Sequence, residues 1–221
     1  MKRSTLRTRA ATLTIAGLAL AAAGASAQQS PAHAHMGHVA DAFGNTPDGQ
    51  GLLPVALAEA GVAQQHAELA LRNTEDLAAM QRHAGHVLHA LDPSQMEQGP
   101  GAGYGVKRAA EGVVQHISMA GEHESASENV ALHSTHVATS ARNTIERTDR
   151  AVALAHEVMH ATDAATAAEA LQELATLTGQ IVDGEDANGD GRVGWQEGEG
   201  GLRQAEQHMN LMKQGEGMGG R

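Results

Sequence analysis

The chain has 221 residues, no cysteine, one residue each of Phe, Tyr and Trp, and a formal net charge of −11. The lack of cysteine excludes disulfides and thiolate metal sites, and the excess of acidic residues argues against nucleic acid as a partner, because phosphate groups bind basic surfaces. The composition therefore indicates an aliphatic core and an acidic surface that favours cations.

Residues 1–27 have the features of a secretory signal peptide. Four basic residues within the first nine precede an apolar run over residues 10–24, and Ala-Ser-Ala at 25–27 is a small-residue cleavage site. The run is too short for a transmembrane helix, which needs about 20 apolar residues. We therefore expect a mature chain that is soluble, periplasmic or secreted, and without a membrane span. Loss of the four basic residues would change its formal net charge from −11 to −15.

Residues 28–50 are predicted to form a flexible arm that carries metal ligands. His33, His35, Met36 and His38 lie within a span of six residues. Imidazole and thioether groups together suit copper, zinc or nickel, and the thioether favours copper. We interpret this group as a capture site for copper.

The rest of the chain predicts an all-α fold, a helical bundle built from helical hairpins. Alanine-rich segments with apolar residues at three- and four-residue spacing recur, and no stretch alternates as a strand does. Residues 51–165 are expected to form a histidine-rich bundle whose hairpins turn at Asn73-Thr74 and at Asn143-Thr144. The expected helices span residues 54–72, 75–91, 105–121, 126–142, 145–161, 167–184 and 198–213.

The 14 histidines are the second chemical signal, and none of them lies in residues 1–27. Histidines three or four residues apart share one face of a helix. Such pairs are His83/His86, His133/His136 and His156/His160.

The predicted hairpins would bring some of these histidines together. A turn at Asn143-Thr144 would place His133 and His136 opposite His156 and His160, so that four imidazoles converge on one metal ion. In the first hairpin, His66 and His83 stand at similar heights, with His86 beside them. The alternative is that these histidines are partly exposed polar positions on amphipathic helices.

Residues 156–160 read His-Glu-Val-Met-His and resemble the zincin metallopeptidase signature. In that family two histidines one turn apart bind zinc, and the glutamate, here Glu157, acts as general base. The longer extension with a third histidine is absent downstream. We therefore expect no enzymatic activity, and a storage or structural site if His156 and His160 bind metal.

Residues 186–197 fit every fixed position of the EF-hand calcium loop. The resemblance implies that Asp186, Asn188 and Asp190 direct oxygens at one Ca²⁺ ion, that Arg192 contributes its carbonyl, and that Glu197 closes the shell. Only one such loop is found, and the residues after Glu197 are rich in glycine. We expect residues 166–213 to form an EF-hand-like helix-loop-helix and residues 214–221 a disordered tail.

These features together predict a periplasmic metal-ion-binding protein. It would bind calcium through the loop and copper or zinc through the histidine clusters. Two other interpretations stay open: a calcium-stabilised interaction module with pH-responsive histidines, and a zinc metallopeptidase. The sequence specifies no protein partner.

Overall fold

A computed structural model describes residues 30–218, and the predicted all-α fold is confirmed for them. The predicted signal peptide lies outside the described residues. None of the described helices is long and apolar enough to cross a membrane. The helices are α1 (Pro31–Ala40), the short 3-10 helix η1 (Pro47–Gly49), α2 (Leu52–Ala70), α3 (Leu77–Leu91), α4 (Val106–Glu122), α5 (Glu128–His160), α6 (Ala164–Asp183) and α7 (Leu202–Gly215).

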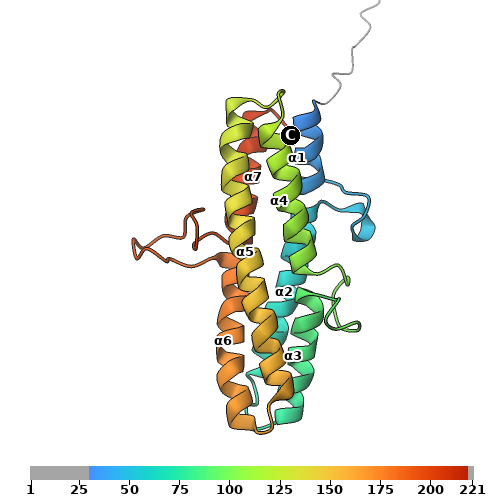
Figure 1. Ribbon diagram of the computed structural model, residues 1–221, viewed down its shortest axis with the longest axis vertical. Coiled ribbons are helices and arrows are strands. Elements are labelled where there is room, and N and C mark those ends of the chain that lie inside the picture. Colours follow the sequence, from blue (N-terminus) through green and yellow to red (C-terminus); the bar gives the residue numbers. More distant parts are fainter. Residues whose placement is uncertain (1–29, 219–221) are drawn as a thin grey trace, which may run out of the picture.

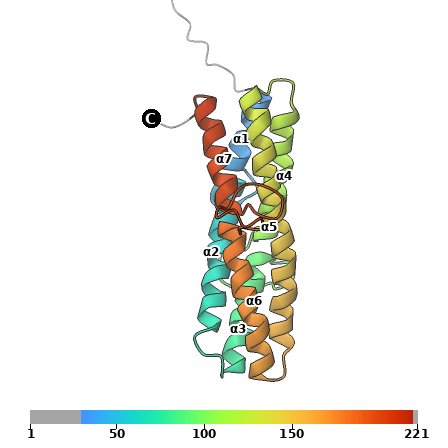
Figure 2. The same cartoon turned by 90° about the vertical axis from the view of Figure 1, so that its left-hand side faces the viewer.

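The helices lie along one long axis in two tiers. In the view of Figure 1, α1, α4, α5 and α7 occupy the upper half, and α2, α3, α5 and α6 the lower half. Three connections project sideways near mid-height: in the view of Figure 1, residues 41–51 and 92–105 project to the right and residues 184–201 to the left. Figure 2 shows the last of these facing the viewer. Of the helices within residues 30–218, α5 alone runs through both tiers without a break, so it is the element against which the others are positioned.

The predicted turn at Asn143-Thr144 is wrong, because α5 continues through it as one helix of 33 residues. The side chain of Asn143 is occupied by the 184–201 connection: its amide donates to the Gln196 carbonyl at 2.8 Å and its carbonyl accepts from the Gly198 N–H at 3.0 Å. The Thr144 hydroxyl donates to a carbonyl of its own helix. Asn143, which suggested a turn, therefore lies inside a helix and bonds to a distant segment of the chain.

Residues 31–40 form the packed helix α1, where the sequence suggested a flexible arm. Ser30 caps this helix by accepting the N–H of His33, and Pro31 occupies its first position. Met36 is 1% exposed and Val39 is fully buried. The flexible arm was predicted from the histidines of this segment. The apolar residues between them, Ala32, Met36 and Val39, line one face of the helix and pack into the core.

The helix expected over residues 198–213 begins only at Leu202. The glycine-rich residues before it belong to the 184–201 connection, which Arg147 of α5 holds in place. This guanidinium is 4% exposed and donates to the carbonyls of Gly198, Glu199 and Gly200. The connection is therefore anchored on the middle of α5.

Candidate metal centres

Three groups of histidines within residues 30–218 are each arranged to hold a metal ion. In every group the candidate ligand nitrogens lie within 4.8 Å of one another, and the side chains are partly buried. We call them triad 1 (His35, His38, His116), triad 2 (His66, His83, His86) and triad 3 (His133, His136, His208).

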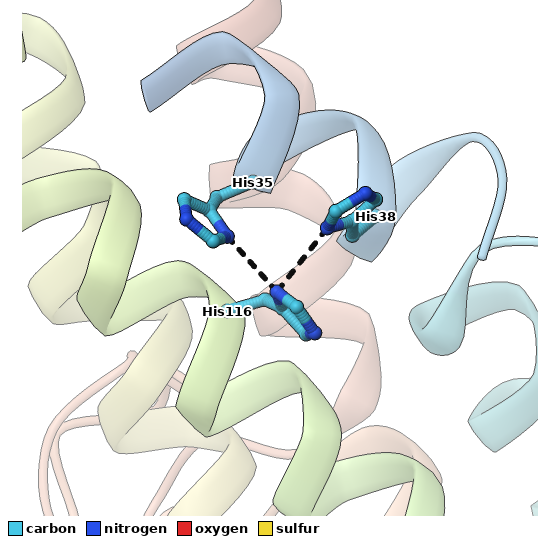
Figure 3. A group of neighbouring side chains, drawn as sticks. All are labelled: His35, His38 and His116. Carbon is cyan, nitrogen blue, oxygen red and sulfur yellow. Dashed lines mark hydrogen bonds between the residues drawn. The ribbon is translucent and has the colours of Figure 1, made fainter. Parts of the chain in front are cut away.

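All three triads are built in the same way. Two histidines three residues apart, the paired histidines, come from one helix, and a single opposing histidine comes from a neighbouring antiparallel helix (Figure 1). Figure 3 shows this for triad 1, where His35 and His38 of α1 point at His116 of α4. Triad 2 joins α3 to α2, and triad 3 joins α5 to α7.

The distances between the Nδ1 atoms are also nearly the same in the three triads. The Nδ1 atom of the opposing histidine lies 3.0–3.1 Å from Nδ1 of the first paired histidine in all three triads. It lies 3.3 Å from Nδ1 of the second. The plane of the opposing ring is tilted by 30–36° from the first paired ring. The three sites are therefore three copies of one local geometry.

The sequence around each triad explains why the geometry repeats. The paired histidines follow the pattern His-x-x-His-Val, and the residues three before, one after and four after the first histidine are buried. The opposing histidines have buried residues at the same three offsets, and each of them follows a glutamine. This spacing is that of a helix stripe facing a core, so each histidine lies at the edge of the packed face.

Hydrogen bonding between imidazoles does not satisfy such a cluster. A neutral imidazole carries either a proton or a lone pair on Nδ1, yet the opposing Nδ1 is within hydrogen-bond distance of two other Nδ1 atoms. A zinc ion bound tetrahedrally at 2.0–2.1 Å would place its nitrogen ligands about 3.4 Å apart. The observed separations are within a few tenths of an ångström of that value. Three nitrogens also leave a fourth coordination position open.

For seven of the nine triad histidines the pKa is lowered, which favours the neutral form that binds metals. Burial, followed by the neighbouring His136 and His133, lowers the pKa of His208 to about 4. Burial is also the main cause that lowers the pKa of His66 and of His116, followed by the paired histidines beside each. Among the paired histidines, burial lowers the pKa of His35, His83, His86 and His136. Metal ions therefore meet little competition from protons at neutral pH.

The predicted site that joins four histidines of one hairpin is wrong. His133 and His156 are 23 positions apart on the continuous helix α5, which separates them by about 35 Å. His133 and His136 instead meet His208 of α7. The rings of His156 and His160 lie 6.0 Å apart, and the described residues add no third ligand to them.

The predicted capture group in residues 33–38 is only partly brought together. His35 and His38 belong to triad 1, whereas His33 lies 2.9 Å from the carboxylate of Glu216 and ties α1 to the end of α7. Met36 points into the core. The thioether that favoured copper is therefore absent from the triad.

In the candidate calcium loop, acidic side chains accept hydrogen bonds from backbone N–H groups of the loop itself. Asp186 accepts the N–H groups of Gly189 and Gly191, each at 2.8 Å, and Asp190 accepts the N–H of Arg192 at 2.9 Å. Glu197 is exposed, and no helix begins at the residue after it, since α7 starts only at Leu202.

The acid that enters this loop is Glu199. It is 4% exposed, binds the Asn188 amide and accepts the Gly194 N–H. Among the described residues, the acids of the loop do not form a group comparable to the triads.

Helical spacing in the sequence does not point to His116 and His208 as ligands. Both carry a recognisable signal, a Gln-His dipeptide with buried residues at the same offsets as His66. Sequence spacing alone could not show it, because their partners are 78 and 72 residues away.

In comparisons with known proteins, no family model, no curated protein and no solved structure matches this chain. The function is therefore argued from the three triads, each of which could hold a metal ion.

Proposed function

We propose that the protein binds three first-row transition-metal ions, one at each triad, and that zinc or copper is the ion. The repetition carries this proposal. One cluster of three histidines could arise by accident in a histidine-rich chain. Three clusters with the same ligand atoms, the same separations and the same surrounding burial pattern indicate one purpose.

The ligand set selects the class of metal. Neutral imidazole is a borderline ligand that suits zinc, divalent copper and nickel, whereas calcium and magnesium prefer oxygen. Three imidazoles with one open position match the coordination that zinc adopts with three histidines and a water molecule. Met36 is buried in the core, so triad 1 has no thioether ligand that would favour monovalent copper.

Three separate and similar sites are better suited to holding several metal ions than to catalysing a reaction. A catalyst needs one reactive centre, while a buffer or carrier gains from each additional site. We therefore propose a non-enzymatic role in holding metal ions. We also propose that the protein acts in the periplasm, which the signal-peptide features of residues 1–27 support.

Calcium binding at residues 186–197 is a second candidate. The loop motif is complete, and Asp186 turns its carboxylate inward to accept loop N–H groups. Calcium should then raise the melting temperature, and Asp186→Ala should remove this rise. An unchanged melting temperature in calcium would exclude it, and a chain that binds calcium alone would favour the interaction-module interpretation.

Isothermal titration of the full mature chain tests the main proposal. The protein is purified without a metal-affinity resin, stripped with a chelator and titrated with Zn²⁺. We expect three equivalents to bind. The triple variant His66→Ala, His116→Ala, His208→Ala loses every opposing histidine and should bind none of the three tightly.

A matched triple variant provides the control. His123→Ala, His156→Ala and His160→Ala also remove three histidines, but none of them belongs to a triad. This control should retain three equivalents. Equal losses in both triple variants, or no binding by the unaltered chain, would contradict the proposal.

A further inference from the structure

The three triads share their ligands but differ in what surrounds them. Two of the three aromatic residues in the chain pack on triad imidazoles. The ring centroid of Phe43 lies 5.4 Å from that of His38 and 4.9 Å from that of His116. Trp195 is stacked on His136, with centroids 3.9 Å apart and planes 20° apart.

Both aromatics reach the same member of their triad from unrelated segments. Phe43 belongs to the connection after α1 and Trp195 to the connection before α7, yet each contacts the second paired histidine, and Phe43 also contacts the opposing His116. Both connections are among those that project at mid-height (Figure 1). The third aromatic, Tyr104, occupies the remaining mid-height connection but packs under the Arg108 guanidinium.

Triad 2 therefore lacks the feature that the other two share. Within residues 30–218, the rings that pack on His86 are those of its own triad partners. His86 therefore lacks the additional aromatic contact that orients His38 and His136. Ordering a free side chain on binding costs conformational entropy, whereas a ring already held by stacking is oriented in advance.

A charge also distinguishes triad 2. Arg82 precedes its first paired histidine, and the residues at this position in triads 1 and 3 are the uncharged Ala34 and Leu132. The charge of Arg82 acts on both paired imidazoles of triad 2. A positive charge that opposes a protonated imidazole also opposes a metal cation at the same place.

We infer that the triads form two classes, in which triads 1 and 3 bind their ion tightly under Phe43 and Trp195, and triad 2 binds weakly and exchanges fast. This inference rests on the proposed function. The protein would then keep two ions and give up the third first. We expect the zinc affinity of triads 1 and 3 to exceed that of triad 2 by about tenfold, because the difference arises from one aromatic contact and one partly screened charge.

Three single-triad forms of the full chain test the ranking. Replacing the opposing histidines of two triads by alanine leaves the third intact, and each form is titrated with Zn²⁺ alone. Triad 1 and triad 3 should bind about tenfold more tightly than triad 2. Stopped-flow transfer of zinc to a chromogenic chelator should show the fastest release from triad 2.

Substitutions outside the triads then test the cause. In the triad 3 form, Trp195→Leu should weaken binding part of the way toward that of triad 2, and Trp195→Phe should restore most of the loss. Phe43→Leu should do the same in the triad 1 form. In the triad 2 form, Arg82→Ala should tighten binding, and high salt should reduce the effect of Arg82.

Controls separate positioning of a ligand from general damage to the fold. Tyr104→Leu removes the aromatic that touches no triad and should leave all three affinities unchanged. In the chain with all triads present, Trp195→Leu should weaken one site while triad 1 keeps its affinity, which a global loss of stability would not do.

The outcomes of the two proposals are distinct. If no single-triad form binds zinc, the proposed function itself fails. If all three bind with the same affinity, or if Phe43→Leu and Trp195→Leu leave affinity and release rate unchanged, the function stands and the division into two classes is wrong.

Discussion

Single residues decide whether each triad is a metal site, and the opposing histidine matters most. It contacts both paired histidines, so its replacement should disrupt a triad more than the loss of either paired residue. Sequence spacing could predict the pairs, because residues three apart share a helix face. It could not predict His116 or His208 as partners, since helix packing between distant segments brings them in.

The depressed pKa of His208 predicts an acid-sensitive metal-free protein. A group whose pKa is 6.5 when unfolded and about 4 when folded binds more protons in the unfolded state between these values. The contribution to stability is therefore complete above pH 6.5 and is lost as the pH falls toward 4. Melting temperatures in a chelator should fall between pH 6.5 and 5, before the carboxylates titrate, and less steeply for His208→Gln. An identical profile for the variant would contradict the assignment.

Trp195 should report occupancy of triad 3. It is the only tryptophan and is stacked on His136, so Cu²⁺ bound there lies next to the indole and should quench its fluorescence. His208→Ala should abolish most of the quenching at low copper, whereas His116→Ala in triad 1 should leave it intact. Equal quenching in both variants would show that copper reaches the indole from another site.

At the level of elements, local and tertiary signals have different predictive value. The hairpin of α2 and α3 turns where the sequence indicates, near Asn73-Thr74, and brings His66 to 3.0 Å from His83 as expected. The same Asn-Thr pair at 143–144 lies inside a helix. The difference is that Asn143 has a partner in the 184–201 connection, which a local pattern does not contain.

Arg147 should be the main link between α5 and that connection. Arg147→Met would leave the carbonyls of Gly198, Glu199 and Gly200 without their buried donor, at a cost of about 3 kcal/mol in the free energy of unfolding. The freed connection should also move Trp195 off His136 and shift its emission to the red.

Urea unfolding with a matched variant checks this link. Arg150 lies three residues further on the same helix, and its ion pair with Glu173 is exposed on both sides. Arg150→Met should therefore change the free energy of unfolding by less than about 1 kcal/mol. If the two variants lose the same stability, the anchoring role of Arg147 is wrong.

For the whole molecule, the triads link pairs of helices that also pack against each other through the core. Each triad joins two helices, α1 to α4, α2 to α3, or α5 to α7, across a core in which alanine is frequent. Bound ions would add cross-links in both tiers. The all-α fold could be predicted from helical periodicity, but the two-tier arrangement depends on where the mid-height connections interrupt the helices.

Metal binding to the folded state should therefore raise thermal stability in steps. Each occupied triad contributes about 2.7 kcal/mol when free zinc is a hundredfold above its dissociation constant. The melting temperature should rise with the logarithm of free zinc. The melting temperature should rise less in a variant in which one opposing histidine, His66, His116 or His208, is replaced by alanine. A melting temperature that does not depend on zinc would contradict binding to the native state.

The most direct measurement is a crystal structure of the zinc-loaded protein with anomalous diffraction recorded at the zinc absorption edge. The three triads predict three anomalous peaks, each bonded to two paired histidines and one opposing histidine, with a fourth position held by water or an exogenous ligand. Peaks located only at His156 and His160 or in the 184–201 connection, with the triads free of metal, would contradict the central claim.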